Sequence, residues 1–180
     1  MNRRVLAVAY AAAFVASVTC TAARADASNV GPTGFVVTFQ REVNAPPEKL
    51  WTAITQIPNW WSSTHTWSGK ASNMTVDLRA GGCWCESWEG NSVLHGTVAF
   101  IQPGTVLRFY ANLGPLQDKA TTGVLTFAQG VAKGKTVLKV IYKISGPADA
   151  GLEELSKGVD QVLGEQVKRL VMFAESGKVE

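Results

Sequence analysis

One long amphipathic segment near the end of the chain, residues 152–174, limits the possible folds more than any other feature. At about 100° per residue, one stripe of the predicted helix holds Leu152, Leu155, Val159, Val162, Leu163, Gln166, Leu170 and Phe173. A helix with a single apolar stripe is built to cover an apolar surface. Gln166 interrupts the stripe, so its amide needs either a backbone partner or a wet cavity, and both possibilities stay open.

The residues before this helix alternate as strands do. Two short helices are expected after the first strand, because Pro46 and Pro47 suit a first helical turn and Pro58 ends the helical stretch. The order predicts an α+β fold, in which a seven-stranded, mostly antiparallel, curved sheet wraps around the long C-terminal helix. The seven predicted strands cover residues 35–43, 74–79, 83–88, 93–101, 106–111, 121–127 and 136–145.

The first residues follow the order of a secretory signal peptide. Two arginines precede an apolar run at residues 5–18, and Ala23 and Ala25 form an A-x-A cleavage site, with cleavage after Ala27 as a second choice. A run of about 14 apolar residues is too short to span a bilayer, which needs about 20. We therefore expect a protein exported to a bacterial periplasm, with a signal peptide at 1–25, a flexible arm at 26–34, one domain at 35–175 and a tail at 176–180.

Loss of the signal peptide balances the charge of the chain. The whole sequence has 17 basic and 14 acidic residues, and removal of Arg3, Arg4 and Arg24 leaves 14 of each sign. A basic face for nucleic acid or for an anionic membrane is therefore not indicated. We predict no nucleic-acid partner and no stable membrane insertion after cleavage. The sequence does not specify an oligomeric state.

Four short motifs resemble a known superfamily. They are Val43-Asn44-Ala45-Pro46-Pro47-Glu48-Lys49-Leu50-Trp51, Pro58-Asn59-Trp60-Trp61, Gly81-Gly82-Cys83-Trp84 and His95-Gly96-Thr97-Val98. They resemble the START-like, or SRPBCC, superfamily with the helix-grip (Bet v 1-like) fold, and most closely its bacterial branch named after the activator of heat-shock-protein ATPase. The resemblance covers residues 35–174. It implies a deep, mainly apolar cavity between sheet and helix, in which members bind lipids, sterols, hormones, pigments or polyketides, and a few branches are enzymes.

The strand at 83–88 holds the candidate polar group of that cavity. Strand alternation puts Trp84, Glu86 and Trp88 on one face, and the resemblance implies that the Trp84 position points inward. A carboxylate between two indoles would then line the cavity, and burial without a cationic partner would raise its pKa. Glu86 is thus a ligand handle and a candidate catalytic acid or base. The alternatives are that a bulge turns it to solvent or that a Lys or Arg pairs with it.

Two cysteines share the opposite face of this strand. Residues two apart on a strand lie about 6.6 Å apart between Cα atoms, at the far edge of disulfide reach. We favour two thiols at Cys83 and Cys85 and keep a local disulfide as the second possibility. Neither His65 nor His95 has zinc-ligand spacing, so no metal or other cofactor is predicted. His95 shares a face with Thr97, which the resemblance turns outward, so His95 is expected to face solvent.

Aromatic side chains complete the predicted cavity. Trp60 and Trp61 lie in the segment that covers the cavity entrance in the superfamily, where they could stack on a flat ligand or simply fill space. Phe109 and Tyr142 are expected among the inward apolar walls. The predicted ligand-binding residues are Trp60, Trp61, Trp84, Glu86, Trp88, Phe109, Tyr142 and Gln166.

Three functions fit this sequence. The first is an exported protein that binds or carries a small hydrophobic molecule between the sheet and the C-terminal helix. The second is a cyclase- or dehydratase-like enzyme that uses Glu86 in the same cavity. The third is a chaperone-like interaction module, which only the name of the branch suggests and which export disfavours, because the namesake's partner is cytosolic. We rank binding above catalysis.

Overall fold

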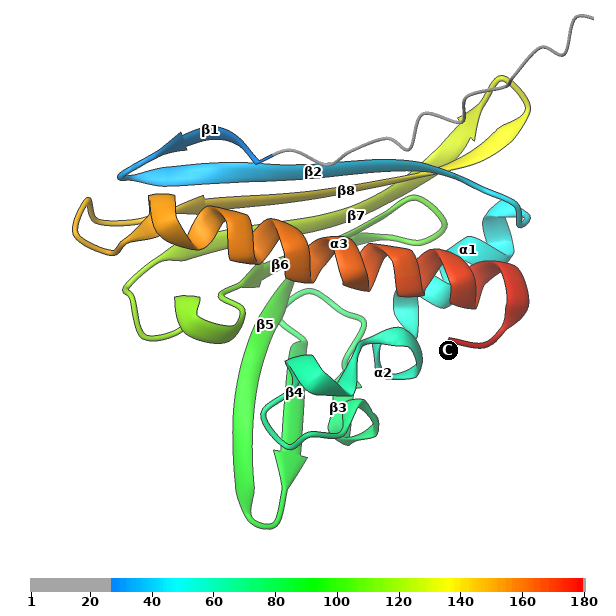
Figure 1. Cartoon of the computed structure of the whole chain (residues 1–180). Coiled ribbons are helices and arrows are strands. Elements are labelled where there is room, and N and C mark those ends of the chain that lie inside the picture. Colours follow the sequence, from blue (N-terminus) through cyan, green and yellow to red (C-terminus); the bar gives the residue numbers. More distant parts are fainter. Residues whose placement is uncertain (1–26, 180) are drawn as a thin grey trace, which may run out of the picture.

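The computed structural model describes residues 27–179, so the predicted signal peptide at 1–25 lies outside the described part. A sheet and one long helix dominate the structure (Figure 1). Along the chain the elements are β1 (Ser28–Gly31), β2 (Gly34–Val43), α1 (Pro47–Thr55), α2 (Ile57–Trp60), η1 (Ser63–His65), η2 (Ala71–Asn73), β3 (Met74–Val76), β4 (Cys83–Trp88), β5 (Asn91–Gln102), β6 (Val106–Ala111), η3 (Gly114–Leu116), β7 (Thr122–Ala132), β8 (Lys135–Ser145) and α3 (Leu152–Ser176).

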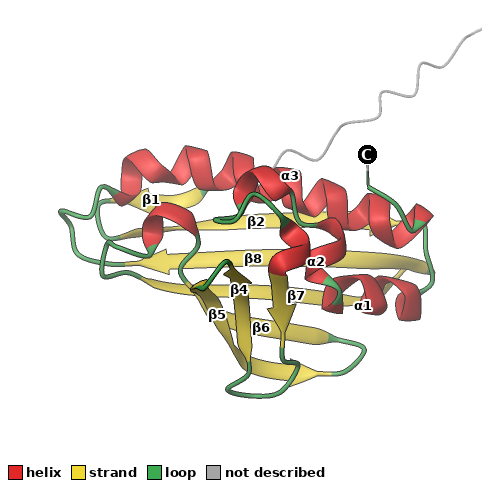
Figure 2. Ribbon diagram, turned by 90° about the horizontal axis from the view of Figure 1, so that it is seen from below, coloured by secondary structure: helices red, strands yellow, loops and turns green. Residues whose placement is uncertain are grey.

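The strands form one eight-stranded sheet in the order β1-β2-β8-β7-β6-β5-β4-β3. Every neighbouring pair is antiparallel. The sheet bends strongly, so that β4 and β5 run across the direction of β2 and β8 (Figures 1 and 2). Helix α3 extends along β2 and β8, while α1 and α2 lie near its C-terminal half (Figure 1). The α+β helix-grip prediction is confirmed, with eight strands in place of seven.

The eighth strand lies where a flexible arm was predicted. In the arm expected at 26–34, β1 pairs antiparallel with β2, and Ser28 opposes Val36. Three of the four residues of β1 are exposed, so the sequence has no apolar alternation that would predict this strand. Backbone hydrogen bonding at the edge of β2 is enough to order such a segment. The prediction of a flexible arm is therefore wrong for β1.

Helix α3 packs differently along its two halves. It ends at Gly177, where φ is 76° and the backbone N–H donates to the Phe173 carbonyl over 2.8 Å, a left-handed cap that glycine favours. The C-terminal half buries Leu163, Val167, Leu170 and Ala174. In the N-terminal half, stripe residues Leu155, Val159 and Val162 are only half-buried. The predicted apolar stripe is therefore buried at Leu152 and along most of its second half, but residues 155, 159 and 162 between them are not fully covered.

Two strand ends differ by three residues or more from those expected. β3 ends at Val76, three residues before the predicted end at 79. β7 continues to Ala132, because the turn to β8 contains only Lys133 and Gly134, both with positive φ. Such two-residue turns match the twist of paired strands. Among the described residues, no helix has the length and apolar character needed to cross a membrane.

Candidate functional site

A pocket of about 690 Å³ lies beside the N-terminal half of α3. Three segments form its walls: α3 itself, residues 61–67 after α2, and residues 113–118, which include η3. His95 from β5 and Tyr142 from β8 also line it. The part of the helix stripe that is not fully covered therefore borders this pocket.

The α3 wall is apolar. Leu155, Val159 and Val162 line the pocket, and Gly158 lies among them. A Cβ atom placed on Gly158 would meet no heavy atom within 4 Å. The pocket therefore reaches the helix backbone at this position, and a larger side chain here would occupy pocket space.

The charged groups that line the pocket are mainly acidic. Asp118 and Glu154 are both exposed lining residues. His65 also lines it, and its Nε2 lies 3.1 Å from Oε2 of Glu165. No Lys or Arg is found among the described lining residues. Within residues 27–179, no group of three or more His, Cys, Asp and Glu side chains is arranged to hold a metal ion.

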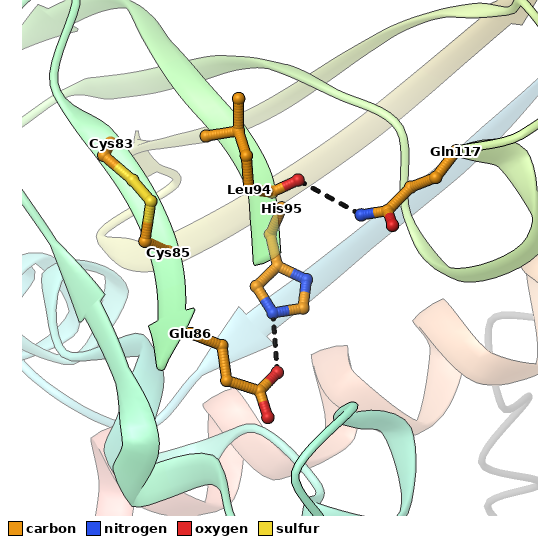
Figure 3. The surroundings of a disulfide bond; sticks show 6 residues. All are labelled: Cys83, Cys85, Glu86, Leu94, His95 and Gln117. Carbon is orange, nitrogen blue, oxygen red and sulfur yellow. Dashed lines mark hydrogen bonds and ion pairs between the residues drawn. A yellow bond between two sulfur atoms is a disulfide. The ribbon is translucent and has the colours of Figure 1, made fainter. Parts of the chain in front are cut away.

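Glu86 does not line the pocket, although its side chain is fully buried. Its Oε2 accepts a hydrogen bond from the Trp67 backbone N–H at 3.1 Å, and its Oε1 accepts one from the Ser68 backbone N–H at 2.5 Å. Nε2 of His95 lies 2.8 Å from Oε2 (Figure 3). Burial alone would raise the pKa of Glu86, but hydrogen bonds from Ser68, Trp67 and His95 outweigh burial and lower it.

These contacts correct two expectations about Glu86. The prediction of a raised pKa is wrong, because backbone N–H groups and a histidine stabilise the carboxylate where a lone buried acid was expected. Glu86 was also expected to line the cavity, but Trp67 and His95 line the pocket and Glu86 lies behind them. Glu86 therefore hydrogen-bonds to two residues that line the pocket, Trp67 and His95.

His95 is buried where an exposed side chain was expected, so that prediction is wrong. The cause is a bulge: Trp84 opposes Gly96 and Cys85 opposes Leu94, which leaves His95 as an extra residue in β5. An extra residue interrupts strand alternation, so His95 turns inward although Leu94 before it is exposed. Burial lowers the pKa of His95, and the hydrogen bond and charge of Glu86 oppose this only in part.

The structure joins Cys83 and Cys85 in a disulfide (Figure 3). The preference for two thiols is therefore corrected. The Cα atoms are 5.5 Å apart, well inside disulfide range and closer than an extended strand would place them. Both residues are half-buried on the face opposite Glu86.

Two of the eight predicted ligand-binding residues line the pocket. Trp61 does so with its indole Nε1 donating to the His65 carbonyl over 2.9 Å. Tyr142 lines it with its hydroxyl donating to the Ala111 carbonyl over 2.9 Å and accepting from the Leu113 N–H over 3.2 Å. Burial raises the pKa of Tyr142. Its hydroxyl therefore already has a donor and an acceptor partner within the protein.

The other five predicted residues, besides Glu86, lie elsewhere. Trp60, Trp84 and Phe109 are core residues, and the Trp84 ring centroid lies 5.3 Å from that of Phe109. Trp88 is half-buried but does not line the pocket. Gln166 accepts a hydrogen bond from the Ser62 backbone N–H over 2.8 Å and donates to a helix carbonyl, so backbone groups satisfy its amide. Space filling, the simpler role considered for Trp60, fits its position.

Sequence reasoning missed His95 as a pocket residue and the 113–118 segment as a wall. One signal was available for His95: the glycine that follows it, because an isolated glycine inside a strand often marks a bulge. Nothing in the sequence of 113–118 points to a pocket wall.

Comparison with known proteins identifies one family whose sequence pattern matches this chain. The family described as "Activator of Hsp90 ATPase homolog 1-like protein" matches residues 44–172. Comparison with curated proteins finds no significant match.

Among solved structures, the protein MLL2253 from Mesorhizobium loti is 21% identical, with a TM-score of 0.56, over 76% of this chain and 94% of that one. CalU16 from Micromonospora echinospora is 18% identical, with a TM-score of 0.54, over 78% and 74%. The Aha1 dimer from Colwellia psychrerythraea is 13% identical, with a TM-score of 0.57, over 79% and 98%. At these identities the structures show a shared fold.

The family match spans more than half of the chain, from the end of β2 to the last turns of α3. It includes every segment that lines the pocket. The chain therefore belongs to the Activator of Hsp90 ATPase homolog 1-like family, within the START-like (SRPBCC) superfamily.

Proposed function

We propose that this protein binds a small hydrophobic molecule in the pocket beside α3. A pocket of about 690 Å³ falls in the range of small-molecule sites, which are mostly apolar with a few polar groups. The family and its fold fit a ligand-binding or cyclase-like role. The proposal concerns the pocket and the class of ligand, which is an apolar compound.

The proposal rests on the N-terminal half of α3, where apolar side chains of the stripe are only half-buried and line the pocket. Leu155, Val159 and Val162 have the spacing of core residues, yet they border open space. Gly158, in the same wall, costs about 1 kcal/mol relative to alanine in a helix and keeps that space empty. Apolar surface of this kind is stabilised when an apolar ligand covers it.

The experiment is a comparison of compounds retained by two tryptophan variants. In Gly158→Trp the new indole would occupy the pocket, whereas in Gln161→Trp it would sit on an exposed position of the same helix. Native mass spectrometry and organic extraction should find an apolar compound on the wild type and on Gln161→Trp, and much less on Gly158→Trp. A wild type that retains no compound and shows no thermal shift with lipids or aromatics would contradict the proposal and favour an interaction module.

A catalytic role is the second candidate, and the Glu86–His95 pair favours it. A buried carboxylate bonded to one histidine nitrogen orients the ring and leaves the other nitrogen for proton transfer. In this version His95 contacts the substrate and Glu86 is a positioning residue. The test is incubation of the retained compound with the protein, followed by mass spectrometry for loss of water or for an isomeric cyclised product. An unchanged compound would leave binding as the function.

We also propose that the protein acts outside the cytoplasm. The expected signal peptide at 1–25 supports export, and a disulfide such as Cys83–Cys85 is typical of oxidising compartments. Fractionation of the native host should find the mature chain, starting near residue 26, in the periplasm. Recovery of the full-length chain from the cytoplasm would contradict export.

A further inference from the structure

The hydrogen bond between Glu86 and His95 fixes which ring nitrogen carries the proton. Both carboxylate oxygens of Glu86 accept backbone N–H groups, from Trp67 and Ser68. These bonds keep the group ionised at neutral pH, and an ionised carboxylate can only accept. Nε2 of His95 therefore donates its hydrogen to Glu86 over 2.8 Å.

The second nitrogen of His95, Nδ1, is then a hydrogen-bond acceptor. Burial favours the neutral ring, and a neutral imidazole with hydrogen on Nε2 has a free lone pair on Nδ1. Figure 3 shows Nδ1 on the ring edge away from Glu86, toward the side on which Gln117 lies. Gln117 belongs to the 113–118 segment that walls the pocket. Among residues 27–179 no group is found that donates to Nδ1.

Other polar groups of the pocket interior are already engaged. The Tyr142 hydroxyl has partners in Ala111 and Leu113, and the Trp61 indole N–H has one in the His65 carbonyl. Among the buried side chains that line the described pocket, the open acceptor is Nδ1 of His95, whereas the carboxylates of Asp118 and Glu154 are exposed. A buried acceptor favours ligands that bring a donor to it.

The acidic side chains that line the pocket restrict the class of ligand further. Asp118 and Glu154 line the pocket without a Lys or Arg among the described lining residues, and His65 is paired with Glu165. A carboxylate ligand would meet like charge there and would bring an acceptor to another acceptor. Fatty acids and similar anions are therefore disfavoured.

Resting on the proposed binding function, we propose that the pocket selects uncharged apolar molecules that carry a hydroxyl group, with that hydroxyl donating to Nδ1 of His95. Phenols, enols and alcohols on a flat or polycyclic skeleton have this chemistry. The bulge at His95 turns a buried polar side chain toward this pocket. Glu86 serves as a positioning residue that holds the ring and its proton.

The test uses three fluorescent probes of one shape: 1-hydroxypyrene, 1-methoxypyrene and 1-pyrenecarboxylate. Binding is measured at pH 7 by energy transfer from the tryptophans of the protein. One buried hydrogen bond corresponds to about a tenfold difference in Kd. The wild type should bind 1-hydroxypyrene about tenfold more tightly than 1-methoxypyrene, and 1-pyrenecarboxylate most weakly.

Variants assign the preference to His95. His95→Leu should abolish the hydroxyl preference, whereas His95→Gln should keep part of it, because its amide can donate to Glu86 and present its carbonyl to the pocket. Leu94→Ala, on the exposed face of the same strand, should keep the full preference. The wild-type probe series tests the hydroxyl preference itself without any variant.

The outcomes separate this inference from the proposed function. Equal binding of 1-hydroxypyrene and 1-methoxypyrene, both lost in Gly158→Trp, would overturn the hydroxyl preference and leave hydrophobic binding intact. Tightest binding of 1-pyrenecarboxylate would overturn the inference as well. Absence of binding by all three probes would overturn it together with the proposed function. A preference that persists in a folded His95→Leu would show that another group recognises the hydroxyl.

Discussion

Oε2 of Glu86 lies 2.8 Å from Nε2 of His95, and both side chains are buried. Glu86 comes from β4 and His95 from β5, and the same carboxylate binds the backbone N–H groups of Trp67 and Ser68. One buried charge thus joins two strands and the segment that bears a wall of the pocket. The geometry of the pocket depends on a residue that does not line it.

Glu86→Gln should destabilise the fold at pH 7. The amide NH₂ of glutamine would face donors that now bond to a carboxylate, and an unsatisfied buried donor costs about 1–3 kcal/mol. Urea unfolding should show this loss, and Glu153→Gln, an exposed substitution at the start of α3, should change the unfolding free energy by less than about 0.5 kcal/mol. Equal stability of the two variants would contradict a structural role for Glu86.

The difference in unfolding free energy between the wild type and Glu86→Gln should depend on pH. The pKa of Glu86 is lower in the folded protein than its ordinary value. Its contribution to stability is therefore complete above the unfolded glutamate pKa, about 4.3, and is lost as pH falls through the lowered folded pKa. Unfolding free energies of wild type and Glu86→Gln should differ at pH 7 and converge in this acid range. A difference that stays constant down to about pH 2 would refute the assignment.

Gln166→Leu should destabilise the protein without weakening ligand binding. The substitution keeps the side chain similar in size but makes it apolar, and it leaves the buried Ser62 N–H without its acceptor, at a cost of about 1–3 kcal/mol. Gln161→Leu, on the exposed face of α3, is the control. Thermal unfolding measures the first effect and probe titration the second. Loss of binding in a folded Gln166→Leu would restore the ligand role first predicted for this residue.

Gly158→Ala should stabilise the protein, because alanine removes a helix cost of about 1 kcal/mol and its Cβ meets open space. Gly164→Ala, in the same helix, is the matched comparison. Its Cβ would lie 3.3 Å from Phe39, so contact offsets part of the same gain. Chemical denaturation should rank Gly158→Ala above Gly164→Ala. The reverse order would show that the wall at Gly158 is not open.

Replacing both cysteines, in Cys83→Ser with Cys85→Ser, should cost little stability. A disulfide between residues two apart closes a very small loop, for which chain entropy predicts a contribution on the order of 1–2 kcal/mol. Reductant should lower the Tm of the wild type by a similar amount and leave that of the double variant unchanged. A reductant effect on the double variant, which keeps neither of these cysteines, would assign the effect to another cause.

The fold was predictable because its signals are periodic. Alternation along residues 35–43 and 136–145 gave two paired strands, and the stripe from Leu152 onward gave α3. These patterns reflect burial on one face of each element, and burial follows directly from side-chain chemistry. β1 was missed because an exposed edge strand has no such face.

The candidate site was much less predictable. Alternation correctly turned Glu86 inward, but the sequence could not show the backbone donors that hold it, since these depend on the path of residues 67–68. His95 was placed outward because parity assumes an unbroken ladder. Trp84 and Trp60 are large enough for a ligand site, yet size alone does not separate a core residue from a pocket residue.

The bulge in β5 has a consequence for how this site can change over evolution. If the strand lost its bulge at unchanged length, alternation from Thr97 would turn His95 outward and Leu94 inward, with no change in the identity of either residue. The isobutyl group of Leu94 would then replace the imidazole of His95 in the pocket, and the acceptor Nδ1 would be lost. Relatives with identical side chains in this strand can therefore differ in specificity through strand register alone, and a sequence alignment without gaps would not reveal that difference.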